Sequence, residues 1–132
     1  SIPTNGTVFL SISNKLKVEF IELAKRLKKL GFDLIATKGT ASHLRSSNIT
    51  SKVIWRISDN KSPDILSIMR EGNVNLIINL PTGKQAATDG AQMRRLAVEL
   101  GIPFITTITG ADAAIKSLEE GENDYLVPIN KK

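Results

Sequence analysis

Few of the residue types that carry covalent or metal chemistry occur in this sequence of 132 residues. It has no cysteine, which excludes disulfides, thiol nucleophiles and thiolate metal sites, and fits a cytoplasmic protein. Its only histidine is His43, which has no cluster of possible ligands near it in the sequence, and one histidine with scattered acids does not supply a metal site. We therefore expect His43 to be a surface or packing residue, and the chain to have no metal site and no catalytic residues of its own.

Aromatic residues and long apolar runs are also scarce. One tryptophan, one tyrosine and four phenylalanines do not alternate with basic residues, as they do in proteins that bind single-stranded nucleic acids. The longest apolar runs, such as 74–80, are interrupted by Asn75 and Asn79 and are far too short to cross a bilayer. Residues 1–6 lack the basic and apolar regions of a signal peptide. We expect neither a nucleic-acid partner nor a membrane.

Positive charge, by contrast, is in excess. The net charge of +5 favours anionic partners such as phosphates, carboxylates or an acidic protein surface. Several of the basic residues fall on one face of a predicted helix, and the simplest interpretation of that face is solvation: Lys15, Lys17, Lys25, Arg26, Lys28 and Lys29. The length and the hydrophobic fraction of 41% suit one domain with a real core. We expect residues 1–132 to be that single domain, excised from a longer chain because Ser1 and Lys132 begin and end it abruptly.

Short apolar runs alternate with helical patterns along the chain. The runs predict strands at 7–12, 32–37, 52–57, 74–79 and 102–106, with a short edge strand at 125–129. Near-continuous apolar strands that alternate with helices are typical of a parallel sheet covered on both faces. We therefore predict a Rossmann-like, three-layer α/β/α sandwich with a central parallel sheet of about five strands.

The helices are predicted between these strands. Their expected ranges are 14–30, a short helix through 44 after a turn at 38–40, 62–72, 91–100 and 109–120. Asn14 is the predicted cap of the first helix, and Ser62 with Pro63 is predicted to open the third. Glycines stand where helices should end, at positions 31, 72 and 101.

The loops that follow the strands are the expected place for a ligand, because open parallel sheets bind ligands outside the carboxyl ends of their strands. The residues predicted there are rich in hydroxyls, glycine and cations and nearly free of carboxylates: Ser11, Ser13, 37–40, Arg56, 79–84 and 106–109. Such an edge suits an oxyanion, because backbone N–H groups at helix starts add to the side-chain donors. The phosphate-loop and dinucleotide fingerprints are absent, since 81–84 resembles only the tail of the former.

Two residues near this edge have more than one interpretation. Asp89 is the only carboxylate placed to face the ligand. It is either a functional group or an acid that stabilises the positive N-terminus of a helix. Trp55 either stacks on the ligand or covers the sheet.

Four segments together resemble a known family. They are Leu-Ser-Ile-Ser-Asn-Lys-Leu-Lys at 10–17, Ala-Thr-Lys-Gly-Thr-Ala at 36–41, Leu-Ile-Ile-Asn-Leu-Pro at 76–81, and Arg-Arg-Leu-Ala at 94–97 followed by Gly-Ile-Pro. In this order they resemble the methylglyoxal-synthase-like fold over roughly residues 6 to 120. Within that fold, the match is to the C-terminal allosteric domain of the carbamoyl-phosphate synthase large subunit. The resemblance implies a non-catalytic regulatory domain that binds a small anionic effector.

The resemblance also implies which residues contact the effector. They are Ser11, Lys17, Thr37, Gly39, Thr40, Trp55, Arg56, Asn79, Thr82 and Gly83. Lys17 and Arg56 are the implied counter-charges. Loop 79–83 departs from the nucleotide-regulated members, because Leu80 and Pro81 look more like acetylglutamate-regulated relatives. The effector is therefore left open among UMP, IMP and acetylglutamate.

A domain of this kind implies partners and cofactors outside itself. The resemblance implies the remainder of the large subunit and a glutaminase small subunit as partners. It places ATP and a divalent metal in the parent ligase, which serves pyrimidine and arginine biosynthesis, and no cofactor in this domain.

Two alternatives stay open. A stand-alone methylglyoxal synthase-type phosphate lyase would share the fold, but Ala86 stands where that enzyme needs a histidine and Ser62 near where it needs an aspartate. A module that serves chiefly to form a homo-oligomer would bind no metabolite.

Overall fold

The computed structural model describes residues 6–81 and 84–121 and contains a parallel sheet with helices on both faces. The strands lie in the order β3-β2-β1-β4-β5. Their bounds are β1 Thr7–Ile12, β2 Asp33–Ala36, β3 Lys52–Val53, β4 Leu76–Leu80 and β5 Phe104–Ile105. Every pairing is parallel, so all carboxyl ends meet at one edge of the sheet.

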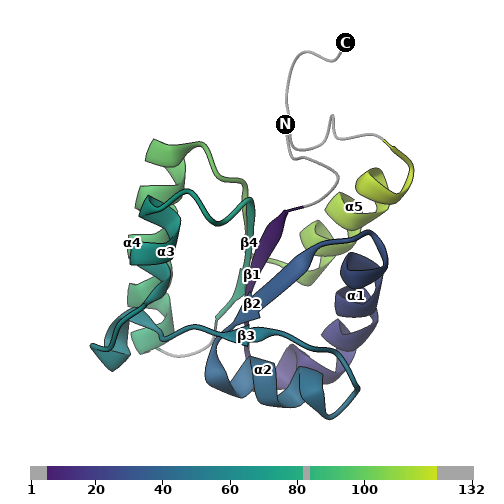
Figure 1. The fold of residues 1–132 in the computed structure, drawn as a ribbon, viewed down its shortest axis with the longest axis horizontal. Coiled ribbons are helices and arrows are strands. Elements are labelled where there is room, and N and C mark those ends of the chain that lie inside the picture. The colour runs from purple at the N-terminus through teal and green to yellow at the C-terminus, as the bar shows by residue number, and fades with distance from the viewer. Residues whose placement is uncertain (1–5, 82–83, 122–132) are drawn as a thin grey trace.

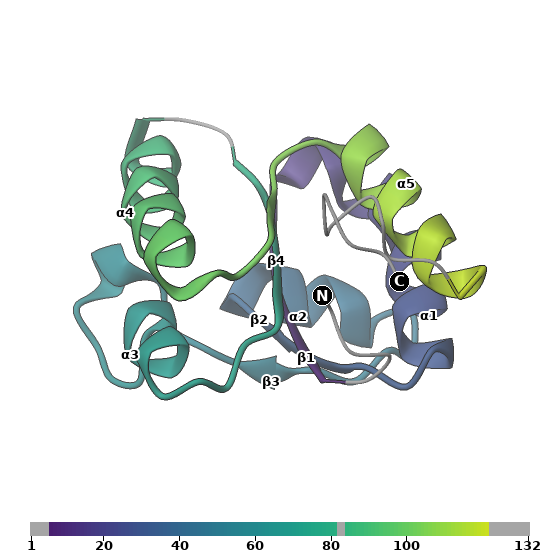
Figure 2. The same cartoon turned by 90° about the horizontal axis from the view of Figure 1, so that it is seen from above.

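Helices cover the two faces of this sheet in separate groups (Figures 1 and 2). Their bounds are α1 Lys17–Lys29, α2 Lys38–Arg45, α3 Ile65–Arg70, α4 Lys84–Leu100 and α5 Ile108–Glu119. Helices α3 and α4 lie on one face, and α1, α2 and α5 pack on the other. This arrangement confirms the predicted three-layer α/β/α sandwich with five parallel strands.

The core follows from the alternation of side chains along each strand. In β1, Val8 and Leu10 are buried against α1, α2 and α5, whereas Phe9 is buried against α3 and α4. Every residue of β4 is buried, as expected for a strand covered on both faces. The sheet therefore joins two apolar clusters and gives its carboxyl edge a rigid base.

The predicted helix ends are confirmed by backbone conformation. Gly31 and Gly72 follow α1 and α3 with φ of +99° and +80°. A Cβ at either position would meet nothing within 4 Å, so glycine is favoured by the left-handed conformation and not by lack of space.

Two predicted helix starts are wrong. Asn14 does not cap the first helix, because it lies inside a 3-10 turn, Asn14–Leu16, that precedes α1. Ser62 and Pro63 do not open the third helix either. Asp64 caps it, and its carboxylate accepts from the Ser67 backbone N–H at 3.0 Å. The sequence prediction overlooked Asp64, one residue after Pro63, whose carboxylate satisfies one of the free N–H groups at the start of the helix.

The third strand is much shorter than predicted. Only Lys52–Val53 pair with β2, whereas 52–57 was expected. Trp55 makes one isolated bridge to Asp64, and Ile57–Asp59 form a second 3-10 turn. Because β3 is an edge strand, pairing is required on one side only, and the chain leaves the sheet early. This departure carries 55–59 over the carboxyl edge.

The remaining helices are longer than expected at their starts. Residues 38–40, predicted as a turn, belong to α2, and α4 begins at Lys84. The predicted edge strand 125–129 lies outside the described residues. Among residues 6–81 and 84–121, no helix has both the length and the apolar character needed to cross a membrane.

Candidate functional site

A cleft of about 700 Å³ opens at the carboxyl edge of the sheet, over the ends of β1, β2 and β4. Its volume lies in the range of small-molecule sites, and its place beside β1 is the switch point of the strand order. Many of the predicted site residues line it: Ser11, Lys17, Thr37, Gly39, Thr40, Trp55 and Arg56. Thr82 and Gly83 lie outside the described residues.

Lys17 supplies one cation beside the start of α2. Its ammonium donates to Asn14 Oδ1 at 2.8 Å. A Cβ on Gly39 would lie only 3.1 Å from Lys17 Nζ, so the helix backbone and the lysine approach closely. A glycine at this position thus leaves room for the ammonium against the first turn of α2, where a larger side chain would displace it.

Two buried threonines tie α2 to the end of β1. Thr40 Oγ1 accepts from the Ile12 backbone N–H at 3.0 Å and from the Thr37 hydroxyl at 3.1 Å. Thr37 precedes α2, but its side chain does not cap the helix. The first N–H groups of α2 thus have no side-chain cap and can donate to an anion in the cleft. Thr40 therefore has a structural role, and only its hydroxyl proton is left for a ligand.

Arg56 enters the cleft already paired with a carboxylate that sequence reasoning missed. Its Nη2 lies 3.0 Å from Asp59 Oδ1, and its backbone N–H donates to Asp59 Oδ2 at 3.0 Å. The guanidinium holds the pKa of the Asp59 carboxyl below its usual value, and Asp59 in turn raises the pKa of Arg56. The spacing Arg-x-x-Asp was visible in the sequence, but the predicted strand 52–57 would have kept the two side chains apart.

Trp55 lies beside Arg56 and is half-buried along the cleft. Lys61 Nζ lies 4.5 Å from the centre of its ring, a cation–π distance. One face of the indole is thus occupied by Lys61, and the Trp55 backbone bridges to Asp64. The residue lines the cleft and also fixes the segment that leaves β3, so both interpretations of Trp55 have a basis in the structure.

A recess of about 30 Å³ lies behind the cleft and shares Ser11, Thr37 and Arg56 with it. Asn79 is 3% exposed and lines this recess next to Ser11, its partner in the β1–β4 register. A Cβ on Gly90 would lie 2.9 Å from Asn79 Nδ2, so α4 packs tightly on the amide. The recess is large enough for a water molecule but not for an effector, so Asn79 lines it without lining the cleft itself.

Asp89 also lines the recess, from α4 beyond its first turn. Its carboxylate is 6% exposed and accepts from the Ser58 hydroxyl at 3.0 Å. It thereby holds the turn that carries Asp59 against α4. His43 is not among the described lining residues, and no group of three metal-ligating side chains occurs within 6–81 and 84–121.

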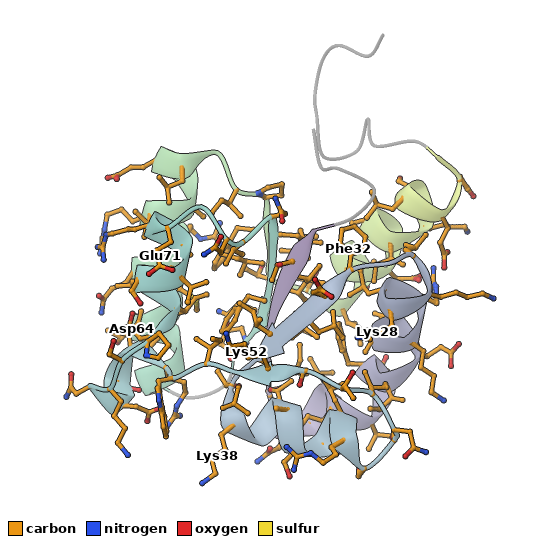
Figure 3. All side chains as sticks on the ribbon, in the orientation of Figure 1. Lys28, Phe32, Lys38, Lys52, Asp64 and Glu71 are labelled. Atoms are coloured by element: carbon orange, nitrogen blue, oxygen red, sulfur yellow. The ribbon has the colours of Figure 1, made fainter. Side chains whose placement is uncertain are left out.

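Cations outnumber carboxylates along the described lining of the cleft. The charged side chains of this lining are three cations, Lys17, Lys38 and Arg56, and one carboxylate, Asp59. Lys38 projects from the start of α2, whereas Lys28 belongs to α1 and Lys52 to β3 (Figure 3). Those two lysines line a second hollow of about 650 Å³ beside the starts of β1, β2 and β3, which includes no predicted site residue. The excess of cationic donors at the carboxyl edge is therefore compatible with an oxyanion ligand.

Comparison with protein families gives one match over most of the chain. The model of the MGS-like domain matches residues 19–106.

Similar sequences occur in larger proteins of archaea. The carbamoyl phosphate synthase large chain, C-terminal section, of Methanopyrus kandleri is 45% identical over 119 residues, which is 89% of this chain and 22% of that protein. The same section from Methanocaldococcus jannaschii is 46% identical over 118 residues, 89% of this chain and 19% of that protein. A carbamoyl phosphate synthase large chain of Methanosarcina barkeri is 40% identical over 133 residues, 98% of this chain and 33% of that protein. The chain thus spans a third or less of each of these relatives.

Solved structures share the fold at low sequence identity. Methylglyoxal synthase from Elizabethkingia anophelis NUHP1 matches with a TM-score of 0.72 and 15% identity, over 99% of this chain and 95% of that one. The crystal structure of ForH matches with a TM-score of 0.60 and 19% identity, over 89% of this chain and 81% of that one. Identities this low show a common fold alone.

Proposed function

Because the chain belongs to the MGS-like domain family, we propose that it is the regulatory domain of a carbamoyl-phosphate synthase large chain. Relatives of that name are similar along nearly its whole length. The catalytic work of the synthase, with its ATP, divalent metal and glutaminase subunit, belongs to the rest of a cytoplasmic enzyme of pyrimidine and arginine biosynthesis. This domain binds an anionic effector and catalyses nothing itself.

The observation that carries the proposal is the cationic cleft at the carboxyl edge. An effector's acidic group binds between Lys17, the start of α2 and Arg56, where ammonium, backbone N–H and guanidinium donors converge. Trp55 flanks the rest of the effector, and Asn79 lines the recess that shares Ser11, Thr37 and Arg56 with the cleft. The family resemblance implies Thr82 and Gly83 as further effector contacts.

Regulation then follows from linkage. An effector that binds this domain better in one state of the synthase shifts the whole enzyme toward that state by the difference in binding free energy. Such coupling is typically about 1–3 kcal/mol, which requires no chemistry within the cleft. The described lining fits this role, because it offers anion donors but no histidine or cysteine.

A thermal-shift screen with UMP, IMP, acetylglutamate, ornithine, phosphate and dihydroxyacetone phosphate tests the proposal. A ligand at 100 times its Kd stabilises the fold by about 2.7 kcal/mol, which raises the Tm measurably. We expect a shift with UMP, IMP or acetylglutamate that Lys17→Gln removes. Lys28→Gln is the matched control, since it removes one lysine charge at the other edge and should leave the shift intact. No shift with any compound, or equal losses in both variants, contradicts the effector site.

The lyase alternative has one observation in its favour, the buried carboxylate of Asp89 beside the cleft. Turnover of dihydroxyacetone phosphate that Asp89→Asn abolishes would replace our proposal by this one. The oligomer alternative predicts no metabolite binding and a change of sedimentation coefficient in cleft variants.

A further inference from the structure

The ion pair between Arg56 and Asp59 lies in the lining of the cleft. We propose that Asp59 is an internal competitor, a carboxylate that occupies the Arg56 guanidinium until the oxyanion of a ligand displaces it. The inference rests on the proposed function, because it concerns how the same cleft takes its anion. It assigns the ligand a carboxylate or phosphate group that can present two oxygens to a guanidinium.

The geometry resembles the recognition of an acidic ligand. Asp59 Oδ1 accepts from Nη2 of Arg56 at 3.0 Å, while Oδ2 lies 3.4 Å from Nε. The carboxylate thus faces the fork of the guanidinium with both oxygens, which is how arginine binds carboxylates and phosphates in general. Since Arg56 and Asp59 both line the cleft, a ligand in the cleft meets this fork directly.

The pair is held in a way that allows it to open. Arg56 is 56% exposed and Asp59 25% exposed, and ion pairs of such exposure contribute little to stability. Asp59 is also anchored independently, because its Oδ2 accepts from the Arg56 backbone N–H at 3.0 Å. It can therefore release the guanidinium while the 3-10 turn Ile57–Asp59 keeps its cap.

Competition of this kind lowers affinity in a predictable way. A ligand that needs Arg56 binds only to the fraction of molecules in which the guanidinium is free, so its apparent Kd rises by the inverse of that fraction. Removing the Asp59 charge should raise this fraction and tighten binding. Asp59→Asn is the suitable variant, because its amide oxygen still accepts from the Arg56 backbone N–H.

The test is an NMR titration of the full chain with sodium sulfate, a bidentate oxyanion, at ionic strength held constant with sodium chloride. We expect Asp59→Asn to bind sulfate about two- to fivefold more tightly than the wild type, the change appropriate to loss of a competing exposed ion pair. Glu71→Gln removes one carboxylate at the far end of α3 and serves as the charge control (Figure 3). It should leave the Kd unchanged, since salt screens a distant exposed charge.

A double-mutant cycle with Arg56→Gln separates competition from a general field effect. If Asp59 acts by occupying Arg56, Asp59→Asn gives no tightening in the Arg56→Gln background. Tightening that persists there overturns the inference, as does weaker binding by Asp59→Asn alone, which would mean that Asp59 orients Arg56. In either case the effector site itself stands. Absence of sulfate binding by the wild type at the resonances of Lys38, Gly39 and Arg56 would contradict both the inference and the anion site.

Discussion

The two edges of the sheet carry hollows of nearly equal size, about 650 Å³ at the amino edge and about 700 Å³ at the carboxyl edge. Both are lined by lysines and by hydroxyl side chains, such as Lys28 and Ser51 at one edge and Lys17 and Thr40 at the other. Size and side-chain composition therefore do not distinguish them.

The difference lies in which end of a helix meets each hollow. Helix α1 ends at the amino edge with Lys28 in its last turn, where the helix dipole stabilises a cation without any ligand. Helix α2 begins at the carboxyl edge, so its uncapped N–H groups and the nearby Lys17 and Lys38 all carry positive charge. An anion would offset this positive charge, which is why we propose the carboxyl edge as the binding site.

The largest expected difference between the two edges is in the unfolding free energy lost when one hydroxyl is removed at each. Thr40→Val leaves the Ile12 N–H and the Thr37 hydroxyl without their acceptor, which should cost about 1–3 kcal/mol of unfolding free energy. Ser51→Ala removes a buried hydroxyl oxygen that has no hydrogen-bond partner among the described residues. We expect its unfolding free energy to stay within about 0.5 kcal/mol of the wild type or to increase.

Urea denaturation of both variants measures this comparison. Equal destabilisation by Thr40→Val and Ser51→Ala would show that the hydrogen bonds of Thr40 are not what holds α2 to β1.

A smaller effect on stability is expected from Gly90→Ala, which tests whether the recess beside the carboxyl-edge cleft contributes to binding. The new Cβ would lie 2.9 Å from Asn79 Nδ2 and would displace the buried amide. Overpacking should lower the unfolding free energy by about 1 kcal/mol or more, and the higher helix propensity of alanine should offset up to about 1 kcal/mol of this loss. Effector affinity, measured by calorimetry, should fall severalfold while the unfolding free energy changes little.

The control for Gly90→Ala is the same change in an Asn79→Ala background, where the obstructing amide is gone. There the alanine should be neutral or stabilising and should cause no further loss of affinity. A further loss in the double variant would place the effect of Gly90 elsewhere in α4.

The smallest predicted effect concerns the ion pairs of Arg26, which we expect to contribute to stability, whereas Arg56 is proposed to contribute to binding. Arg26 joins α1 to α5 through Glu119 and Asp112, each at 2.8 Å. Arg26 holds the pKa of the Glu119 carboxyl below its usual value. A carboxyl whose pKa is lowered in the folded state stabilises the fold at pH values above its pKa in the unfolded chain, about 4.3. This contribution is lost as the pH falls through the pKa of the folded state.

The unfolding free energy of the wild type should therefore be higher than that of Arg26→Gln by about 0.5–1 kcal/mol at pH 6. The difference is small because the ion pair is partly exposed, and it should decrease toward pH 3. Urea denaturation at several pH values measures the gap. A gap that is constant between pH 6 and pH 3 would rule out Glu119 as its source.

Much of the fold could be predicted from the sequence because its signals are local. Buried parallel strands need continuous apolar residues, as 76–80 show, and helix ends in the left-handed conformation favour glycine, as at Gly31. Residues that follow β1, β2 and β3 line one cleft, as predicted from the tendency of parallel sheets to bind ligands at the carboxyl ends of their strands.

What could not be predicted depends on pairing between distant residues. Nothing in the sequence around Thr40 indicates that its hydroxyl accepts from Ile12, 28 positions away, so its structural role could not be predicted. The apolar pattern at 52–57 predicted a full strand, but an edge strand has one neighbour and can end after two residues. That early end creates the turn in which Asp59 reaches Arg56.

The most direct test of the account is a chemical-shift map of backbone amides during titration with whichever of UMP, IMP and acetylglutamate raises the Tm. We predict large, saturating shifts at Ser11, 37–40 and 55–59 and none at 50–52 or 73–75, the backbone of the amino-edge hollow. Shifts confined to 50–52 and 73–75 would contradict the claim that the helix start at the carboxyl edge makes the anion site.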